Sequence, residues 1–155
     1  MSKRSPDGIS ALTSHTGFWL RFVSNHVSHA FARKLAGSGA TVAEWVILRE
    51  IYELGAVSPG RIAAFTGLTR GAVSKLVDRL VRKGLAHRTE ADRDRRFQDL
   101  VLTDAGRELV PRLAVLADRN DEEFFSRLPA AERDALMAIL KKLVALHDLK
   151  KVPTT

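Results

Sequence analysis

Basic and hydroxyl side chains are concentrated in the middle of the chain, on a segment whose apolar residues recur at helical spacing. Between residues 69 and 83, several residues that lie between the apolar ones have side chains that can donate hydrogen bonds, namely Thr69, Arg70, Ser74, Lys75 and Arg79. Arginine and lysine can donate to guanine O6 and N7, and serine and threonine can bond to base or phosphate. The chemistry that this pattern allows is recognition of a polyanion.

A second charged cluster follows in the stretch ADRDRRFQD, residues 91–99, between two segments typical of β-strands. Arginine is the side chain that a narrow, electronegative minor groove attracts. We expect Arg93, Arg95 and Arg96 to act as minor-groove probes. Asp94 would brace the loop by accepting hydrogen bonds from amides or by pairing with a guanidinium. The alternative is a solvated turn whose charges neutralise one another.

The distribution of charge supports a polyanion partner. The net charge is +7, and residues 58–103 carry 10 basic and 5 acidic groups, so this part supplies +5 of the total. A local basic excess attracts nucleic acid because each neutralised phosphate releases condensed counterions. An ordinary solvated surface is the alternative.

Composition excludes several other classes of protein. The 155 residues contain no cysteine, so disulfides, thiolate nucleophiles and cysteine-ligated zinc are excluded. No signal peptide and no apolar run of about 18 residues is visible, which predicts a soluble cytoplasmic protein. We find no phosphate-binding glycine loop and no nucleophile elbow, so we expect no enzyme and no cofactor.

Helices must hold these clusters in place. Apolar residues at three- and four-residue steps predict a long helix over 10–36, and Thr41 with Glu44 forms a capping-box signal for a helix that ends at Gly55. Ser58-Pro59 begins a short helix that ends at Thr66-Gly67. Thr69 can cap the next helix, whose stripe of Val73, Leu76, Val77 and Leu80 faces inward. Two short helices joined by a tight turn make a helix-turn-helix candidate.

After Gly84 the period changes. LAHRTE and FQDLVLT, residues 85–90 and 97–103, predict a β-hairpin with a loop of about six residues. Thr103 then caps a long helix over about 104–127 in which Pro111 should cause a bend or a local break. A last helix begins near Pro129 without an obvious side-chain cap. The broad apolar faces at the two ends of the chain predict a homodimer.

The helix after Thr69 suits a DNA major groove, which admits one helix whose N-terminal residues reach base edges. Arg70 and Lys75 can bind guanine, Ser74 and Thr69 can bind base or phosphate, and Gly71 lets the backbone approach. A surface helix with ordinary charges is the alternative. The hairpin beside this helix would be a wing.

Residues 62–106 closely resemble the winged helix-turn-helix of the MarR-type (multiple antibiotic resistance regulator) transcription factors. The segments LVDRLVRKGLAHR, DRR and LTDAG stand in the family's order and spacing, and AEWVILREIYELG resembles the family's second helix, so the resemblance covers about residues 10–148. Phe97 and Asp99 depart from it, because many relatives have small or basic residues there.

The resemblance implies a mainly α fold with a small β-hairpin wing (α+β). It implies dimerisation helices at 10–36 and 104–149 and a winged helix-turn-helix DNA-binding domain at 41–103; we expect 1–9 and 150–155 to be disordered tails. It further implies a homodimeric regulator, more often a repressor, that binds a pseudo-palindromic operator in double-stranded DNA. The family's DNA contacts carry over to Arg70, Ser74, Lys75 and to Arg95 or Arg96, with Asp94 as organiser. A small, often phenolic effector would release the DNA.

Other candidate sites rest on weaker patterns. His15, Trp19 and Trp45 could line an effector pocket, although core packing explains both tryptophans better. His26 and His29 are three residues apart on one helix, a spacing that a metal site can use, but no third ligand lies close in sequence. The alternatives to a DNA-binding regulator are therefore a winged-helix protein-interaction module and a metal-responsive regulator.

Overall fold

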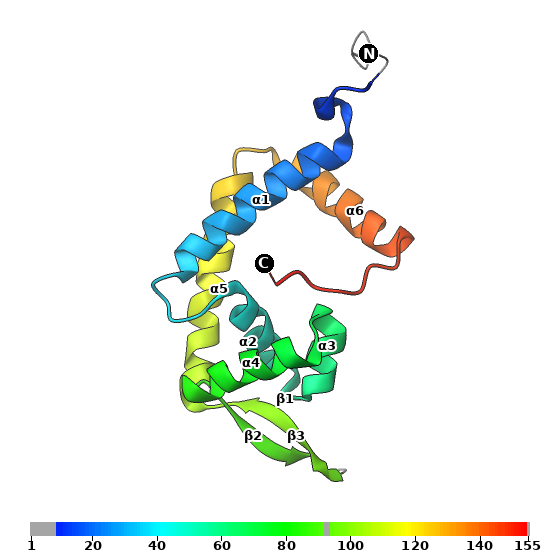
Figure 1. Ribbon diagram of the computed structural model, residues 1–155. Helices are drawn as coiled ribbons and strands as arrows, with labels where there is room; N and C mark the ends of the chain where they lie inside the picture. The colour runs from blue at the N-terminus through cyan, green and yellow to red at the C-terminus, as the bar shows by residue number, and fades with distance from the viewer. Residues whose placement is uncertain (1–8, 92–93, 155) are drawn as a thin grey trace.

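The computed structural model describes residues 9–91 and 94–154 (Figure 1). Its elements in chain order are η1 (Leu12–Ser14), α1 (Thr16–Leu35), α2 (Val42–Leu54), β1 (Ala56–Val57), α3 (Pro59–Thr66), α4 (Arg70–Arg82), β2 (Ala86–Ala91), β3 (Asp94–Leu102), α5 (Asp104–Phe125) and α6 (Ala130–Leu146). The strands form one antiparallel sheet in the order β1-β3-β2. The fold is mainly helical with a small hairpin, which confirms the predicted fold class.

Helices α1 and α6 lie toward one end of the molecule, α2, α3, α4 and the sheet lie toward the other, and α5 runs between them (Figure 1). Helices α1 and α5 pack against each other, and the buried Asn120 of α5 joins them. Its Nδ2 donates to the carbonyl oxygen of Val27 at 3.2 Å, and its Oδ1 accepts from Nζ of Lys34 at 3.1 Å. Asn120 thus holds α1 against the C-terminal half of α5.

The hydrophobic core lies among α2, α3, α4, the sheet and the first half of α5. Its fully buried side chains include Leu35, Ile47, Leu48, Ile51, Val57, Ile62, Val73, Val77, Leu80, Leu100 and Leu113. Helix α6 contributes no buried residue. The short helices thus have a core of their own, whereas the apolar faces near the chain ends remain exposed. Within the described residues no helix is both long and apolar enough to cross a membrane.

Four helices begin at the side-chain caps that the sequence predicts. The hydroxyls of Thr41, Ser58, Thr69 and Thr103 each accept a hydrogen bond from the backbone amide three residues later, at 3.1 to 3.2 Å. Thr41 completes a capping box with Glu44. Helix α3 ends at Gly67, whose φ of 72° lies in the left-handed region that glycine adopts without strain. Helix α6 begins at Ala130 without a side-chain cap, as predicted.

The start of one helix and an additional strand differ from prediction. The helix expected from Ser10 begins at Thr16, because His15 is extended and Trp19 Nε1 donates at 2.8 Å to the Thr13 carbonyl of the preceding 3-10 turn. Strand β1 was not predicted. At Pro111, where we expected a bend or a local break, helix α5 continues without a break; both Pro111 and Arg107, whose carbonyl loses its helical partner, are exposed, so water can bond to that carbonyl.

The hairpin is longer than expected, since β2 reaches Ala91 and β3 begins at Asp94, inside the segment predicted as a six-residue loop. The register is regular from Ala86 to Glu90, where Glu90 pairs with Gln98, and then shifts so that Ala91 pairs with Asp94. Residues 95–97 of β3 therefore have no partner among the described residues of β2, because the two neighbouring residues Glu90 and Ala91 pair with Gln98 and Asp94 on either side of them. Backbone pairing that continues past the irregularity lengthens the two arms.

Two segments outside the helix-turn-helix and its hairpin pack closely against them: the start of α5 and the residues after α6. A Cβ at Gly106 of α5 would stand 2.0 Å from the carbonyl oxygen of Leu85, so only glycine lets α5 begin this close to the hairpin. Residues 150–154, expected to belong to a tail, return to the helix-turn-helix, where the amide of Val152 donates to the carbonyl of Phe65 at 2.9 Å. Residues 1–8 and 155, assigned to the tails, lie outside the described residues.

Candidate nucleic-acid interface

Helix α4 has one buried and one exposed face, as its sequence predicts. Val73, Leu76, Val77 and Leu80 are all buried and pack in the core. The opposite face exposes Arg70, Gly71, Ser74, Lys75, Asp78 and Arg79, and the cap Thr69 is exposed as well. Because the apolar stripe fixes the rotation of the helix about its axis, these polar residues lie on the face opposite the core.

The N-terminal half of this exposed face is not engaged by the protein itself. Within the described part of the chain, no ion pair or hydrogen bond involves the side chains of Arg70, Ser74 or Lys75. The Thr69 hydroxyl and carbonyl already accept from the amides of Ala72 and Val73, which leaves the amides of Arg70 and Gly71 at the positive end of the helix dipole. These donors are therefore available to a partner.

The C-terminal half of α4 is anchored. Asp78 pairs with Arg88 of β2, which ties the hairpin to the helix and neutralises the acid on the exposed face. Sequence reasoning assigned no role to Arg88, and no local signal links a helix residue to a strand residue ten positions later. Arg82 was also missed, although its spacing from Lys75 and Arg79 places all three along one hollow beside α4.

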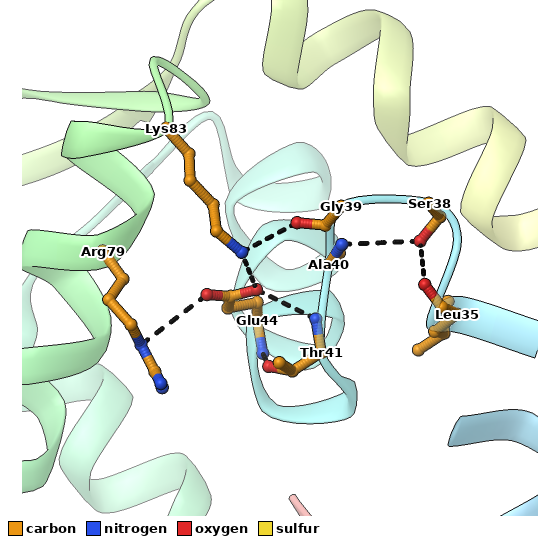
Figure 2. Close-up of polar contacts among 8 residues, drawn as sticks. All are labelled: Leu35, Ser38, Gly39, Ala40, Thr41, Glu44, Arg79 and Lys83. Atoms are coloured by element: carbon orange, nitrogen blue, oxygen red, sulfur yellow. Dashed lines mark hydrogen bonds and ion pairs between the residues drawn. The ribbon is translucent and has the colours of Figure 1, made fainter. Parts of the chain in front are cut away.

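Arg79 and Lys83 meet a buried carboxylate at the start of α2 (Figure 2). Glu44 is completely buried; its Oε2 accepts from Lys83 Nζ at 2.7 Å and from the amide of Thr41 at 2.9 Å. Its Oε1 lies 3.7 Å from Nε of Arg79. Sequence reasoning identified Glu44 only as part of a capping box, because both cationic partners are 35 or more positions away.

The ionised form of Glu44 is favoured despite its burial. Removal from water raises the pKa of a carboxyl group, but here the hydrogen bonds from Lys83 and Thr41 and the charges of Lys83 and Arg79 outweigh that effect. The pKa of Glu44 is consequently lower than its ordinary value. The carboxylate is therefore a fixed negative charge between α2 and α4.

The wing is only partly described. Arg93 lies outside the described residues, and so do the side chains of Asp94, Arg95 and Arg96, whose backbone forms the start of β3. Asp99, the acidic departure noted above, is half-buried and pairs with Thr89 across the hairpin. It therefore lies on the arm of the wing, away from the tip.

The three residues suggested for an effector pocket are not brought together. Trp19 lies in an apolar groove of about 670 Å³ that is lined by Phe22, Val23, His26, Phe124, Phe125 and Leu128 of α1, α5 and the loop after α5, among others. Trp45 instead packs edge-on against Phe31, with ring centroids 6.4 Å apart. His15 is exposed at the start of α1. Only Trp19 of the three lines the groove.

The histidines of α1 have ordinary surroundings. Nδ1 of His26 lies 2.8 Å from the carbonyl oxygen of Phe22 one turn earlier, and the two rings are tilted against each other with centroids 4.6 Å apart. His29 is exposed. Among the described residues no three side chains of the kinds that ligate metals gather at one point. The geometry gives no support to the metal-responsive alternative.

A helix-turn-helix whose second helix presents free donors, followed by a two-stranded wing, defines a winged helix-turn-helix protein of the DNA-binding class. The model of the MarR family matches residues 38–96, from the loop before α2 to the wing. A protein of Thauera aromatica assigned to transcriptional regulation of the hcr operon is 30% identical over 134 residues, which are 86% of this chain and 81% of that protein. The chain belongs to the MarR family of transcriptional regulators.

Two further comparisons agree. The transcriptional repressor MprA of Escherichia coli is 28% identical over 115 residues, which are 74% of this chain and 65% of MprA. The structure of BpsR from Bordetella bronchiseptica, whose DNA binding is regulated by 6-hydroxynicotinic acid, superposes with a TM-score of 0.76 at 26% identity, covering 86% of this chain and 95% of BpsR. The predicted family is thereby confirmed, and with it the expectation of a regulator rather than an enzyme.

Proposed function

We propose that this chain forms a homodimer that binds a pseudo-palindromic operator in double-stranded DNA and represses transcription until a small aromatic effector releases it. The observation that carries the DNA-binding role is the unengaged N-terminal half of α4, where Arg70, Ser74 and Lys75 are exposed and have no partner within the described residues. Such a helix fits a major groove about 12 Å wide.

Each exposed residue of α4 has a distinct role in this proposal. Arg70 and Lys75 donate to guanine edges, and Ser74 bonds to a base or a phosphate. Thr69 and the amides of Arg70 and Gly71 bind a phosphate, as helix N-termini do. Gly71 lets the helix backbone approach the bases, and Arg79 contacts a phosphate nearer the end of the helix.

The wing carries the second contact. Arg93, Arg95 and Arg96 enter the adjacent minor groove, and Asp94 braces them. Support comes from the backbone, because the register shift after Glu90 places residues 95–97 in an irregularity near the end of the hairpin. An irregularity of this kind redirects side chains away from the regular pleat. The Asp78–Arg88 pair holds the hairpin at a fixed angle to α4.

Dimerisation buries the apolar faces that α1 and α6 leave exposed, so that residues 10–36 and 104–149 act as dimerisation helices. Trp19, Leu20, Phe22 and Val23 of α1 are 46 to 50% exposed, and Met137, Ile139 and Leu146 of α6 are 51 to 68% exposed. Large exposed apolar side chains gathered on one helix face often mark a protein–protein interface. Two recognition helices related by a two-fold axis would read half-sites about 34 to 36 Å apart.

The effector acts by population shift. A small aromatic molecule that binds better to one spacing of the two recognition helices lowers affinity for an operator matched to another spacing. The regulation of BpsR by 6-hydroxynicotinic acid supports this chemical class. Trp19 in the apolar groove is the first residue to test as an effector contact, with His15 and Trp45 as the remaining candidates.

The test begins with genomic DNA. Fragments that the protein retains are sequenced, and binding to the recovered duplex is measured by fluorescence anisotropy against a scrambled duplex between 50 and 200 mM salt. We expect specific, salt-dependent binding, since about 6 to 10 phosphate contacts would weaken affinity by roughly 10³ to 10⁵ over that range. Equal affinity for both duplexes would exclude the sequence-specific role.

A single substitution tests the assignment of the recognition helix. Arg70→Ala should cost about 1 to 3 kcal/mol on the selected operator and relax discrimination at one base pair. Arg112→Ala on α5 removes the same charge from another exposed arginine and serves as the control. Loss of affinity by the same factor for every duplex would assign Arg70 to phosphate rather than to a base.

A further inference from the structure

A continuous chain of polar contacts connects the end of α1 to the end of α4 (Figure 2). The hydroxyl of Ser38 donates to the last carbonyl of α1, at Leu35, over 2.7 Å, and accepts from the amide of Ala40 at 3.4 Å. The next residue, Thr41, forms the capping box with Glu44. The loop between α1 and α2 is thus held at both of its ends.

Lys83 attaches the recognition helix to this loop. It is the C-cap of α4, and its ammonium donates to the Gly39 carbonyl and to Glu44 Oε2, each over 2.7 Å. Arg79, one turn earlier on α4, approaches the other carboxylate oxygen of Glu44. Arg79 of α4 and its C-cap Lys83 therefore converge on one buried acid, beside the loop that leads from α1.

The carboxylate is an unusual choice if it serves packing alone. Oε1 of Glu44 is buried without a hydrogen bond, the one such side-chain atom in the described part of the chain. Apolar residues of similar volume often stabilise a site as well as a buried ion pair does, whereas a buried charge with few allowed partners selects one geometry. The charge at Glu44 accordingly restricts how α4 can sit against α2 and the α1–α2 loop.

We propose that Glu44, acting through Lys83 and Arg79, is a positioning residue that fixes the angle of the recognition helix relative to α1. This inference rests on the proposed dimeric DNA-binding function, because α1 belongs to the dimerisation end and α4 reads the DNA. Glu44 then sets the separation of the two recognition helices.

The contacts of Glu44 with Lys83 and Arg79 form a joint between the α1–α2 loop and α4. Small changes in the angle of this joint should move the far end of α4 by a large distance at the DNA. Helix α4 has 13 residues and so is about 20 Å long. A rotation of roughly 10° about its anchored C-terminal end moves its N-terminal end by about 3.5 Å, close to the rise of about 3.4 Å between successive base pairs. Loosening the joint should therefore relax the preference for one spacing of half-sites.

The experiment compares Glu44→Gln and Lys83→Met with the wild-type protein in two measurements. The first is spacing selectivity, the ratio of dissociation constants for the selected operator and for the same operator with one base pair inserted between the half-sites. The second is the distance distribution between two spin labels in the dimer without DNA. Because the chain has no cysteine, His87→Cys on the exposed part of β2 supplies a single labelling site in each protomer.

We expect both variants to lose spacing selectivity by about fivefold or more, the lower end of ordinary coupling between sites, and to broaden or shift the spin-label distances. Lys83→Arg keeps the charge and should restore most of the selectivity. Lys150→Met, an exposed lysine outside the dimerisation helices, controls for the loss of one positive charge.

A purely structural role predicts another result. The variants would then have a lower stability but unchanged spacing selectivity and unchanged distances in the folded fraction, and that outcome overturns the proposal. If Glu44→Gln does not fold, the same two measurements on Lys83→Met, which keeps the carboxylate and its capping box, test the proposal. Absence of duplex binding by the wild-type protein would instead refute the proposed function, and the spin-label distances would still test the joint.

Discussion

Replacing Gly71 with alanine should raise the stability of the protein and lower its affinity for DNA. It is the second residue of α4, it is exposed, and a Cβ built there meets nothing within 4 Å. Alanine is therefore accommodated without strain and loses less backbone entropy on folding than glycine. We expect Gly71→Ala to raise the free energy of unfolding by about 0.5 to 1 kcal/mol, equivalent to roughly 1 to 4 °C in Tm.

The same methyl group should weaken DNA binding. If Gly71 faces the groove, its backbone is among the closest parts of α4 to the bases, and a Cβ about 1.5 Å from Cα holds the helix away from them. Hydrogen bonds from Arg70 and Ser74 then lengthen beyond their useful range of about 3.2 Å. Loss of one good base contact costs about 1 to 3 kcal/mol, or roughly 5- to 150-fold in Kd.

Gly17 provides a matched control. It is also the second residue of a helix, α1, it is exposed, and it too has nothing within 4 Å of a built Cβ. Gly17→Ala should give a similar stability gain and leave operator affinity unchanged. Urea denaturation gives the stabilities, and anisotropy titration of a labelled operator gives the affinities. If Gly71→Ala is more stable and binds the operator as tightly as the wild type, the start of α4 is not in the groove.

Three further results are expected. Gly106→Ala should destabilise the protein by about 1 to 3 kcal/mol in urea denaturation, because the new Cβ meets the Leu85 backbone at 2.0 Å; a gain in stability would show that α5 can shift. The lowered pKa of Glu44 means that its stabilising contribution is present above the unfolded-state pKa and is lost as pH falls through the folded-state pKa. Unfolding measured between about pH 6 and 3 should show this loss in the wild type, and Glu44→Gln should lack that component. Changing Arg95 and Arg96 together to alanine should weaken operator binding and lower its salt dependence, and unchanged affinity at moderate salt would remove the wing from the interface.

Local signals in the sequence were enough to place most helices. Thr41, Ser58, Thr69 and Thr103 each bond to an amide three residues later, so the interaction that begins the helix lies within one turn of chain. The inward stripe of α4 is likewise a matter of spacing along one helix. Such features need no partner from elsewhere, and this is why they could be predicted, together with the family resemblance of residues 62–106.

Features that need a distant partner escaped prediction. Strand β1 has two residues and exists because Ala56 and Val57 pair with Val101 and Leu100 of β3. The irregularity after Glu90 depends on how the two arms of the hairpin pair. Two residues have little strand preference of their own, and only the folded sheet gives their backbone groups a partner.

The sequence by itself determined the class of the protein, the start of its recognition helix and the side chains that this helix exposes. The tertiary structure alone decided that Glu44 is buried against Lys83 and Arg79, that Asp78 is paired with Arg88, and that Trp19 and Trp45 lie apart. The physical reason is the sequence separation of the interacting residues. Caps and helical stripes join residues a few positions apart, whereas ion pairs across elements form only when the packed core brings together segments that the sequence separates by ten to forty residues.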